Sequence, residues 1–90
     1  LYVSDYTAGT IGSYNASDGT AINASLVTGL PNYAFGLAIS GSTLFVTASE
    51  SGAVRTFDAG TGASLNPTFI TGLNRPYGLG IVGSTLFVSD

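Results

Sequence analysis

The chain of 90 residues contains no cysteine, methionine, tryptophan or histidine. Without cysteine, this stretch can form neither a disulfide nor a thiolate metal site. Without histidine, it lacks the usual base of Ser-His-Asp and Cys-His nucleophiles, and zinc and non-haem iron sites lose their usual ligands. We therefore predict a protein that is not an enzyme and has no cofactor.

Charge is also scarce, because only 8% of the residues are charged and the net charge is −3. Nucleic acids and anionic membrane surfaces both require a basic patch, and the chain has only Arg55 and Arg75. No apolar run is long enough to span a bilayer. We expect neither nucleic-acid binding nor membrane insertion.

The chain starts without methionine and shows no signal peptide at its start. We interpret it as an internal segment of a longer natural protein, or as a processed or designed piece of one. Its polar surface must come from Ser, Thr, Asn and Gly instead of charged residues. That composition without cysteine is typical of secreted bacterial proteins and predicts an extracellular or cell-surface location.

The clearest pattern in the chain is an internal sequence repeat. The sequence GSTLFV at residues 41–46 returns at residues 83–88, and LYVSD at residues 1–5 matches LFVSD at residues 86–90 except at Tyr2. The leucines that open these runs lie 43 and 42 residues apart. A period of this length marks a repeat architecture. We divide the chain into a first repeat at 1–43, a second at 44–85 and the first strand of a third at 86–90.

Each repeat contains four short runs rich in β-branched and aromatic residues, separated by turn residues, which predicts four strands. In the first copy the runs are 1–3, 10–14, 21–28 and 36–40, and 44–46 opens the next copy. No apolar period of 3.6 residues is sustained, so no helix is expected. Asp18-Gly19 is the clearest hairpin signal, and we expect Asp18 and Asp58 to accept hydrogen bonds within turns.

Four strands in about 42 residues fit one antiparallel blade of a β-propeller. We therefore predict an all-β chain with two propeller blades plus one extra strand. The strand after Gly36 or Gly78 would be innermost, with no face in bulk water, followed by the LFV strand. The strand ending at Tyr14 or Phe57 would be third, and the one through Leu26 or Phe69 outermost. A β-solenoid and a tandem sandwich are alternatives with a similar period.

Residues 73–81 (LNRPYGLGI), followed by residues 86–90 (LFVSD), resemble the NHL-type propeller repeat. Residues 14–19 (YNASDG) and 23–30 (NASLVTGL) are similar to tandem propeller repeats of secreted bacterial proteins. The resemblance implies a propeller fold. The chain departs from the NHL pattern where that pattern has Arg, at Thr10 and Ala53, and where Asp5 is replaced by Ala48.

NHL-like lactonases and the similar streptogramin-lyase propellers are metal-dependent enzymes with ligands around the axis. The predicted inner strands here, 36–40 and 78–82, contain neither histidine nor carboxylate. A fragment of such an enzyme stays open as an alternative only if other blades supply the site. Two blades do not close a ring, because propellers have about four to eight. We therefore expect further blades as partners, in the same longer chain or as identical chains, and a self-assembling structural fibre is a further alternative.

The loop after the second strand and the loop entering the innermost strand should open on one face, which propellers commonly use for ligands. This candidate loop face consists of Asp5, Tyr6, Asn32, Tyr33, Phe35, Glu50, Asn74, Arg75 and Tyr77. Aromatic and amide groups with one arginine suit a carbohydrate or protein ligand. In the competing interpretation, Tyr33 and Tyr77 pack between blades and the acids only solubilise the rim. A calcium site through Asp5 and Glu50 would lack ligands.

Two formal N-glycosylation sequons begin at Asn15 and Asn23, whereas a third, at Asn66, is blocked by Pro67. Asn15 is replaced by Asp58 in the second copy, which suggests a role in the turn for this position. Taken together, these features predict a non-catalytic extracellular propeller scaffold for binding or interaction.

Overall fold

The computed structural model describes residues 1–5, 9–30, 34–48 and 52–89. These residues form nine strands and no helix, and so no helix that could cross a membrane. The strands are β1 (Tyr2–Asp5), β2 (Thr10–Tyr14), β3 (Ala21–Val27), β4 (Ala34–Ser40), β5 (Thr43–Ala48), β6 (Ala53–Asp58), β7 (Ser64–Ile70), β8 (Leu79–Val82) and β9 (Thr85–Val88).

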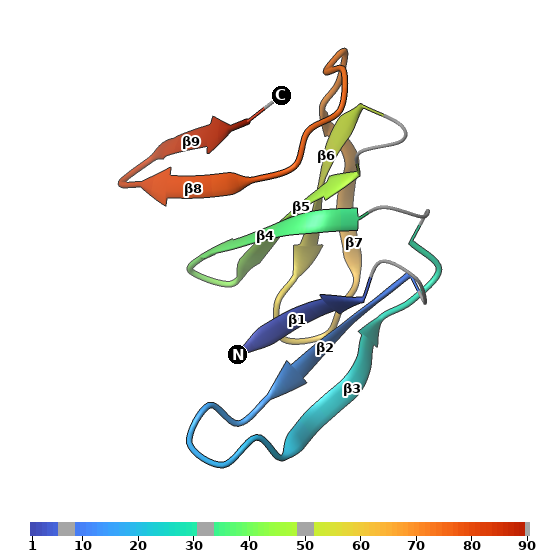
Figure 1. The fold of residues 1–90 in the computed structure, drawn as a ribbon, viewed down its shortest axis with the longest axis vertical. Helices are drawn as coiled ribbons and strands as arrows, with labels where there is room; N and C mark the ends of the chain where they lie inside the picture. Colours follow the sequence, from blue (N-terminus) through green and yellow to red (C-terminus); the bar gives the residue numbers. More distant parts are fainter. Residues whose placement is uncertain (6–8, 31–33, 49–51, 90) are drawn as a thin grey trace.

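The strands form three antiparallel sheets, each a simple meander (Figure 1). The first sheet has the order β1-β2-β3, the second β4-β5-β6-β7 and the third β8-β9. All pairings are antiparallel. The prediction of an all-β antiparallel chain is therefore confirmed, and so is the order of neighbouring strands predicted for a complete four-stranded unit.

Strand register decides which side chains share a face of the second sheet. Leu44 lies opposite Phe57 and Val46 opposite Arg55 in an unbroken β5–β6 ladder. Directly opposed residues project to the same side of a sheet, so Leu44, Val46 and Phe57 all face the first sheet. The β2–β3 and β6–β7 pairings contain register shifts, so the outer strands β3 and β7 are irregular.

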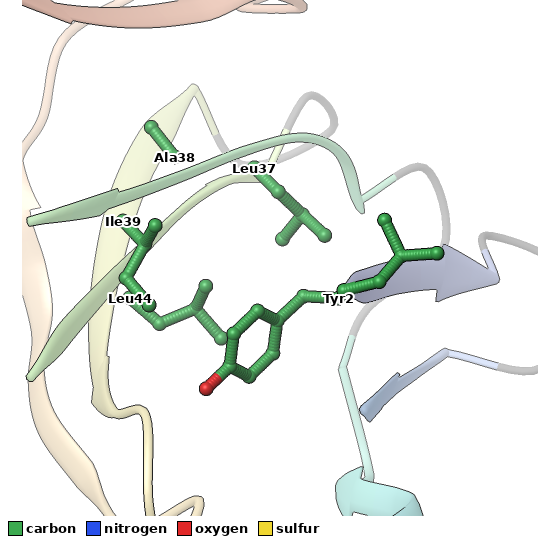
Figure 2. A pocket seen from close by; sticks show the side chains of 6 residues that line it. Tyr2, Leu37, Ala38, Ile39 and Leu44 are labelled. Atoms are coloured by element: carbon green, nitrogen blue, oxygen red, sulfur yellow. The ribbon is translucent and has the colours of Figure 1, made fainter. Parts of the chain in front are cut away.

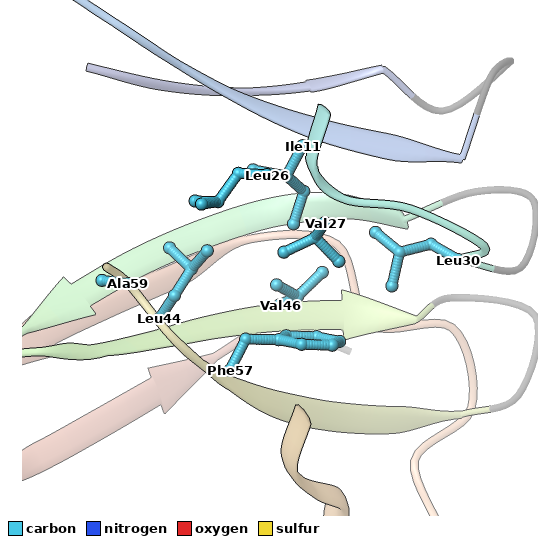
Figure 3. Close-up of a cluster of buried hydrophobic side chains, with 8 residues drawn as sticks. All are labelled: Ile11, Leu26, Val27, Leu30, Leu44, Val46, Phe57 and Ala59. Atoms are coloured by element: carbon cyan, nitrogen blue, oxygen red, sulfur yellow. The ribbon is translucent and has the colours of Figure 1, made fainter. Parts of the chain in front are cut away.

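The main hydrophobic core lies between the first and second sheets (Figure 3). Ile11 and Val46 are 0% exposed and Leu44 is 1% exposed. The buried members are Ile11, Leu26, Val27, Leu30, Leu44, Val46, Phe57 and Ala59, with Tyr2 and Leu37 packed against them. Removing these side chains from water contributes about 1.5–3 kcal/mol for each large residue. The Tyr2 hydroxyl also donates a hydrogen bond of 3.0 Å to the Ala59 carbonyl.

The other face of the second sheet is covered by the chain that leads into β8. Thr47, Val54 and Pro76 are fully buried there. On the β8 and β9 hairpin, by contrast, Val82 is 71% and Phe87 is 58% exposed. Ile39 of β4 is also 46% exposed. The expectation that no face of the innermost strand meets water is therefore wrong, because no described element covers these side chains.

The two connections between sheets begin with the same hydrogen bond. The Leu30 N–H donates to the Gly9 carbonyl at 3.0 Å, and the Leu73 N–H donates to the Gly52 carbonyl at 3.0 Å. Gly9 and Gly52 both adopt the left-handed conformation, with φ of 69° and 65°. The same hydrogen bond and the same left-handed glycine therefore recur one sequence repeat apart.

Candidate functional site

The candidate loop face lies on the side toward which β1 and β5 point and from which β4 starts (Figure 1). Asp5 is exposed at the end of β1, and its carbonyl accepts a hydrogen bond of 2.8 Å from Gly9 N–H. Asn74, Arg75 and Tyr77 come from the single segment that precedes β8 and are exposed. These three residues share one segment, whereas Asp5 belongs to the first sheet, on the other side of the second sheet.

The remaining predicted residues of this face are not placed. Tyr6, Asn32, Tyr33 and Glu50 lie outside the described residues, and for Phe35 only the backbone in β4 is described. Tyr77 is 48% exposed, while its backbone is held in the structure. Ligand contact and packing between blades therefore both stay predictions for this residue.

The backbone of Tyr77 is held by a buried hydroxyl that the sequence analysis missed. Thr47 Oγ1 accepts a hydrogen bond from the Gly36 N–H at 2.7 Å and donates one to the Tyr77 carbonyl at 2.9 Å. Thr47 is 0% exposed. One side chain at the end of β5 therefore ties the start of β4 to the segment that carries Asn74, Arg75 and Tyr77.

The same hydroxyl contact recurs in the third sheet. Ser89 Oγ accepts a hydrogen bond of 2.8 Å from the Gly78 N–H, and Gly78 and Ser89 follow Gly36 and Thr47 by one period. The signal in the sequence was the hydroxyl residue that follows each copy of the LFV or LYV run, at Ser4, Thr47 and Ser89. The repeat shows this hydroxyl residue, but it does not show which main-chain groups the hydroxyl contacts.

The predicted turn role of the acidic residues is confirmed. Asp58 Oδ1 accepts hydrogen bonds from the N–H groups of Gly60 at 2.8 Å and Thr61 at 3.0 Å. Asp18 Oδ1 accepts from the N–H of Thr20 at 3.0 Å and from its hydroxyl at 2.8 Å. Hydrogen bonds to the ionised form lower a carboxyl pKa. The Thr61 and Gly60 N–H groups lower the pKa of Asp58, and the Thr20 N–H and hydroxyl lower that of Asp18.

The asparagines of the two sequons accept similar hydrogen bonds, Asn15 in a turn and Asn23 within β3. Asn15 Oδ1 accepts the Ser17 N–H at 2.8 Å, and Asn23 Oδ1 accepts the Ser25 N–H at 3.1 Å. Asn15 thus makes the same contact to the second following residue as Asp58, which confirms the turn role of this position. Both asparagines are exposed. Their glycosylation stays a prediction.

An open apolar pocket of about 360 Å³ lies between β1 and β4 (Figure 2). It is lined by Leu1, Tyr2, Leu37, Ala38, Ile39 and Leu44. The aromatic ring of Tyr2 forms one wall, and the side chains of Leu37 and Ile39 project toward it from β4. No local pattern in the sequence predicts this pocket, because it depends on how two sheets pack.

Arg55 is a second residue whose environment the sequence did not reveal. It lies opposite Val46 on β6, on the face toward the first sheet. Its Nε is buried and has no hydrogen-bond partner among the described residues. Within the same residues, no group of three or more acidic, histidine or cysteine side chains could hold a metal ion.

No protein-family model, curated protein or solved structure matches the chain. The site must therefore be interpreted from its own geometry.

Proposed function

We propose that the chain is part of a non-catalytic, extracellular β-propeller scaffold that binds a protein or carbohydrate through its loop face. The observation that carries this proposal is the repeated junction between sheets. Leu30 to Gly9 and Leu73 to Gly52 form the same hydrogen bond one period apart. A junction that recurs with the sequence repeat supports an array of blades in which each sheet packs on the next.

The partners of this scaffold are further blades, in the same longer chain or as identical chains. Leu1 and Val3 on the outer side of the first sheet are 66% and 46% exposed, whereas their repeat counterparts Leu44 and Val46 are 1% and 0% exposed. The outer side therefore carries the apolar residues of an internal packing face. A further blade in this position would bury them as the first sheet buries Leu44 and Val46.

Ligand binding is assigned to the segment that precedes β8. Asn74 and Arg75 are exposed and Tyr77 is half-exposed, so an amide, a guanidinium and a phenol are accessible together. Aromatic faces pack on sugar rings or peptide side chains, and amides and guanidinium groups supply directional hydrogen bonds. The backbone of this segment is fixed through Tyr77 by Thr47, which limits the entropy that binding must remove.

The experiment that tests the proposal is the mass and shape of the assembly in solution, measured by light scattering and negative-stain images. A closed disc of identical chains, or of the longer parent chain, is the expected result. Binding to carbohydrate and peptide arrays should then be lost in Arg75→Ala and Tyr77→Ala and retained in Arg55→Lys. Unchanged binding in both loop variants would remove the loop face from the proposal.

A second function is favoured by the exposed apolar side chains at both ends of the molecule. Leu1 and Val3 lie at one end, and Val82 and Phe87 lie at the other. Two different complementary faces form rings if the rotation closes and open filaments if it does not. The alternative function is therefore a repeat subunit of an extracellular fibre. Long filaments in the same images would support this function in place of the binding scaffold.

A further inference from the structure

The outer strands β3 and β7 form the outer edges of the first and second sheets. Among the described strands, β3 has β2 as its one neighbour in the sheet, and β7 has β6. Both strands lie inside the chain, since β4 follows β3 and β8 follows β7. Their open edges therefore belong to the repeating unit. The free N–H and C=O groups of such an edge are a template for strands of other molecules.

Neither outer strand carries the charged side chains that usually protect an edge. Residues 21–27 (AINASLV) and residues 64–70 (SLNPTFI) contain no lysine, arginine, aspartate or glutamate. Ile22 is 70% exposed, and its repeat counterpart Leu65 is 54% exposed. An uncharged segment of this kind on an open edge is prone to pair with copies of itself. Protection of these edges therefore has to come from another feature.

Both outer strands contain the same interruption. The residue pairs on either side leave residues 24–26 of β3 opposite Gly12 alone. One period later, residues 67–69 of β7 lie opposite Arg55 alone. Three residues against one make a bulge with two extra residues. Such a bulge bends the strand and ends the regular alternation of main-chain groups along the edge.

An asparagine side chain holds each bulge in place. Asn23 Oδ1 accepts the Ser25 N–H at 3.1 Å. Asn66 Oδ1 accepts the Thr68 N–H at 3.0 Å and the Thr68 hydroxyl at 3.4 Å. The two copies share the pattern Asn-x-Ser/Thr, although Pro67 prevents the second from being a glycosylation acceptor. The hydrogen bond within the bulge is therefore the requirement common to both copies.

We propose that the asparagine-held bulges of β3 and β7 prevent a strand of a second copy of the chain from adding to the outer edges of the sheets. Strand addition requires main-chain groups that alternate at regular spacing. Each bulge lies in the middle of a seven-residue strand, so only short regular runs remain on either side. Pro67 reinforces the second bulge, because proline has no N–H to donate to an added strand. A chain with few charges thereby avoids cross-β association.

The test follows the formation of cross-β aggregates by the full chain with thioflavin T at about 100 μM, within the range at which exposed edges associate. Asn23→Val removes the acceptor of the Ser25 N–H and introduces a residue that favours a regular strand. The lag time should shorten about tenfold relative to the unmodified chain. Amide exchange of the aggregate should show protection of residues 21–27, which identifies β3 as the segment that pairs.

Asn15→Val is the matched control for this variant. It makes the same exchange of side chains and removes the acceptor of the Ser17 N–H, bonded at 2.8 Å, in a hairpin turn instead of an edge strand. Denaturant unfolding gives the unfolded fraction of each variant, and the lag times are compared at temperatures at which these fractions are equal. The lag time of Asn15→Val should then stay within about twofold of that of the unmodified chain.

A second variant separates edge pairing from loss of stability. Ala24→Pro, added to Asn23→Val, places a proline where Pro67 stands in the second copy and removes an N–H from the strand. The slow aggregation should return, whereas a chain that aggregates because it unfolds would stay fast. Equal acceleration by Asn15→Val and Asn23→Val, an unchanged lag time in Asn23→Val, or no return in the double variant would each overturn the inference. The loop face takes no part in this comparison, so the proposed function stands or fails by its own test.

Discussion

At the scale of single residues, the turn that contains Asp58 makes a prediction about acid stability. Its pKa is lowered from the ordinary value of 3.8 by the N–H groups of Thr61 and Gly60. A carboxyl whose folded-state pKa lies below its unfolded value stabilises the fold above the unfolded pKa. That stabilisation is lost as the pH falls through the folded pKa. Thermal unfolding should therefore shift to lower temperature below about pH 4.

The repeat itself supplies the control for this prediction. Asn15 accepts the same turn hydrogen bond without an ionisable group, so Asp58→Asn should keep the turn and weaken the dependence on acid. Asp58→Ala removes the acceptor and should destabilise the protein at neutral pH as well. Acid dependence that is the same in Asp58→Asn as in the natural chain would contradict the assignment.

The buried Thr47 hydroxyl gives a second prediction at this scale. Thr47→Val keeps the shape but leaves the Gly36 N–H and the Tyr77 carbonyl without a partner, which costs about 2 kcal/mol of unfolding free energy. Thr47→Ser keeps both hydrogen bonds and loses one methyl group, a cost of about 1 kcal/mol. Denaturant unfolding measures both costs. Amide exchange of Gly36 should accelerate in Thr47→Val and not in Thr47→Ser; acceleration in both variants would contradict the assignment.

The contrast between Asp58 and Thr47 explains which parts of the site were predictable from the sequence. Asp58 binds N–H groups two and three residues away, so the local pattern of turn residues was sufficient. Thr47 binds groups 11 and 30 residues away, one of them in the segment that leads to the next sheet. Such contacts follow from packing between sheets, which no local pattern encodes.

At the scale of elements, strand positions followed from local pattern, because each run is short, β-branched or aromatic and bounded by turn residues. The predicted run 10–14 coincides with β2, and 21–28 exceeds β3 by one residue. The order within a sheet followed as well, since short turns join antiparallel neighbours. The register shifts in β3 and β7 did not follow, because irregular pairing depends on both strands.

The crossing from β7 toward β8 makes a prediction about Gly52. Gly52 has φ of 65°, and a Cβ there would overlap the Leu73 carbonyl oxygen, whereas Gly72 has φ of 79° with open space around it. Both Gly52→Ala and Gly72→Ala lose about 1–2 kcal/mol for the left-handed conformation. Gly52→Ala should cost about 2 kcal/mol more, because the crossing must move. Equal losses in denaturant unfolding would show that the crossing is not tightly packed.

At the scale of the whole molecule, exposed apolar residues distinguish the two ends of the chain from its middle. Leu44 lies between two sheets and is buried, whereas its counterpart Leu1 is 66% exposed. Both leucines occupy the same position in the sequence repeat, and only the sheets packed beside them differ. Burial was therefore not predictable from the repeat alone, because it depends on which sheets lie on either side of each strand.

This difference leads to a prediction about assembly. Leu1→Asp should leave the unfolding free energy of the single chain within about 0.5 kcal/mol, as expected for an exposed position. In an assembly that buries this face, the aspartate would lose about 2 kcal/mol of apolar burial and add a buried charge. The dissociation constant should then rise at least about thirtyfold. Sedimentation equilibrium measures this change.

Leu65→Asp is the matched control for the assembly measurement. Leu65 is also apolar, and its exposed fraction of 54% is comparable to the 66% of Leu1. It lies on β7, however, away from the outer face of the first sheet. Its substitution should leave the assembly unchanged if contacts form through the face that carries Leu1. Equal weakening by the two variants would instead point to general hydrophobic association. Loss of assembly in Leu1→Asp alone would identify that face as the one that receives the next repeat.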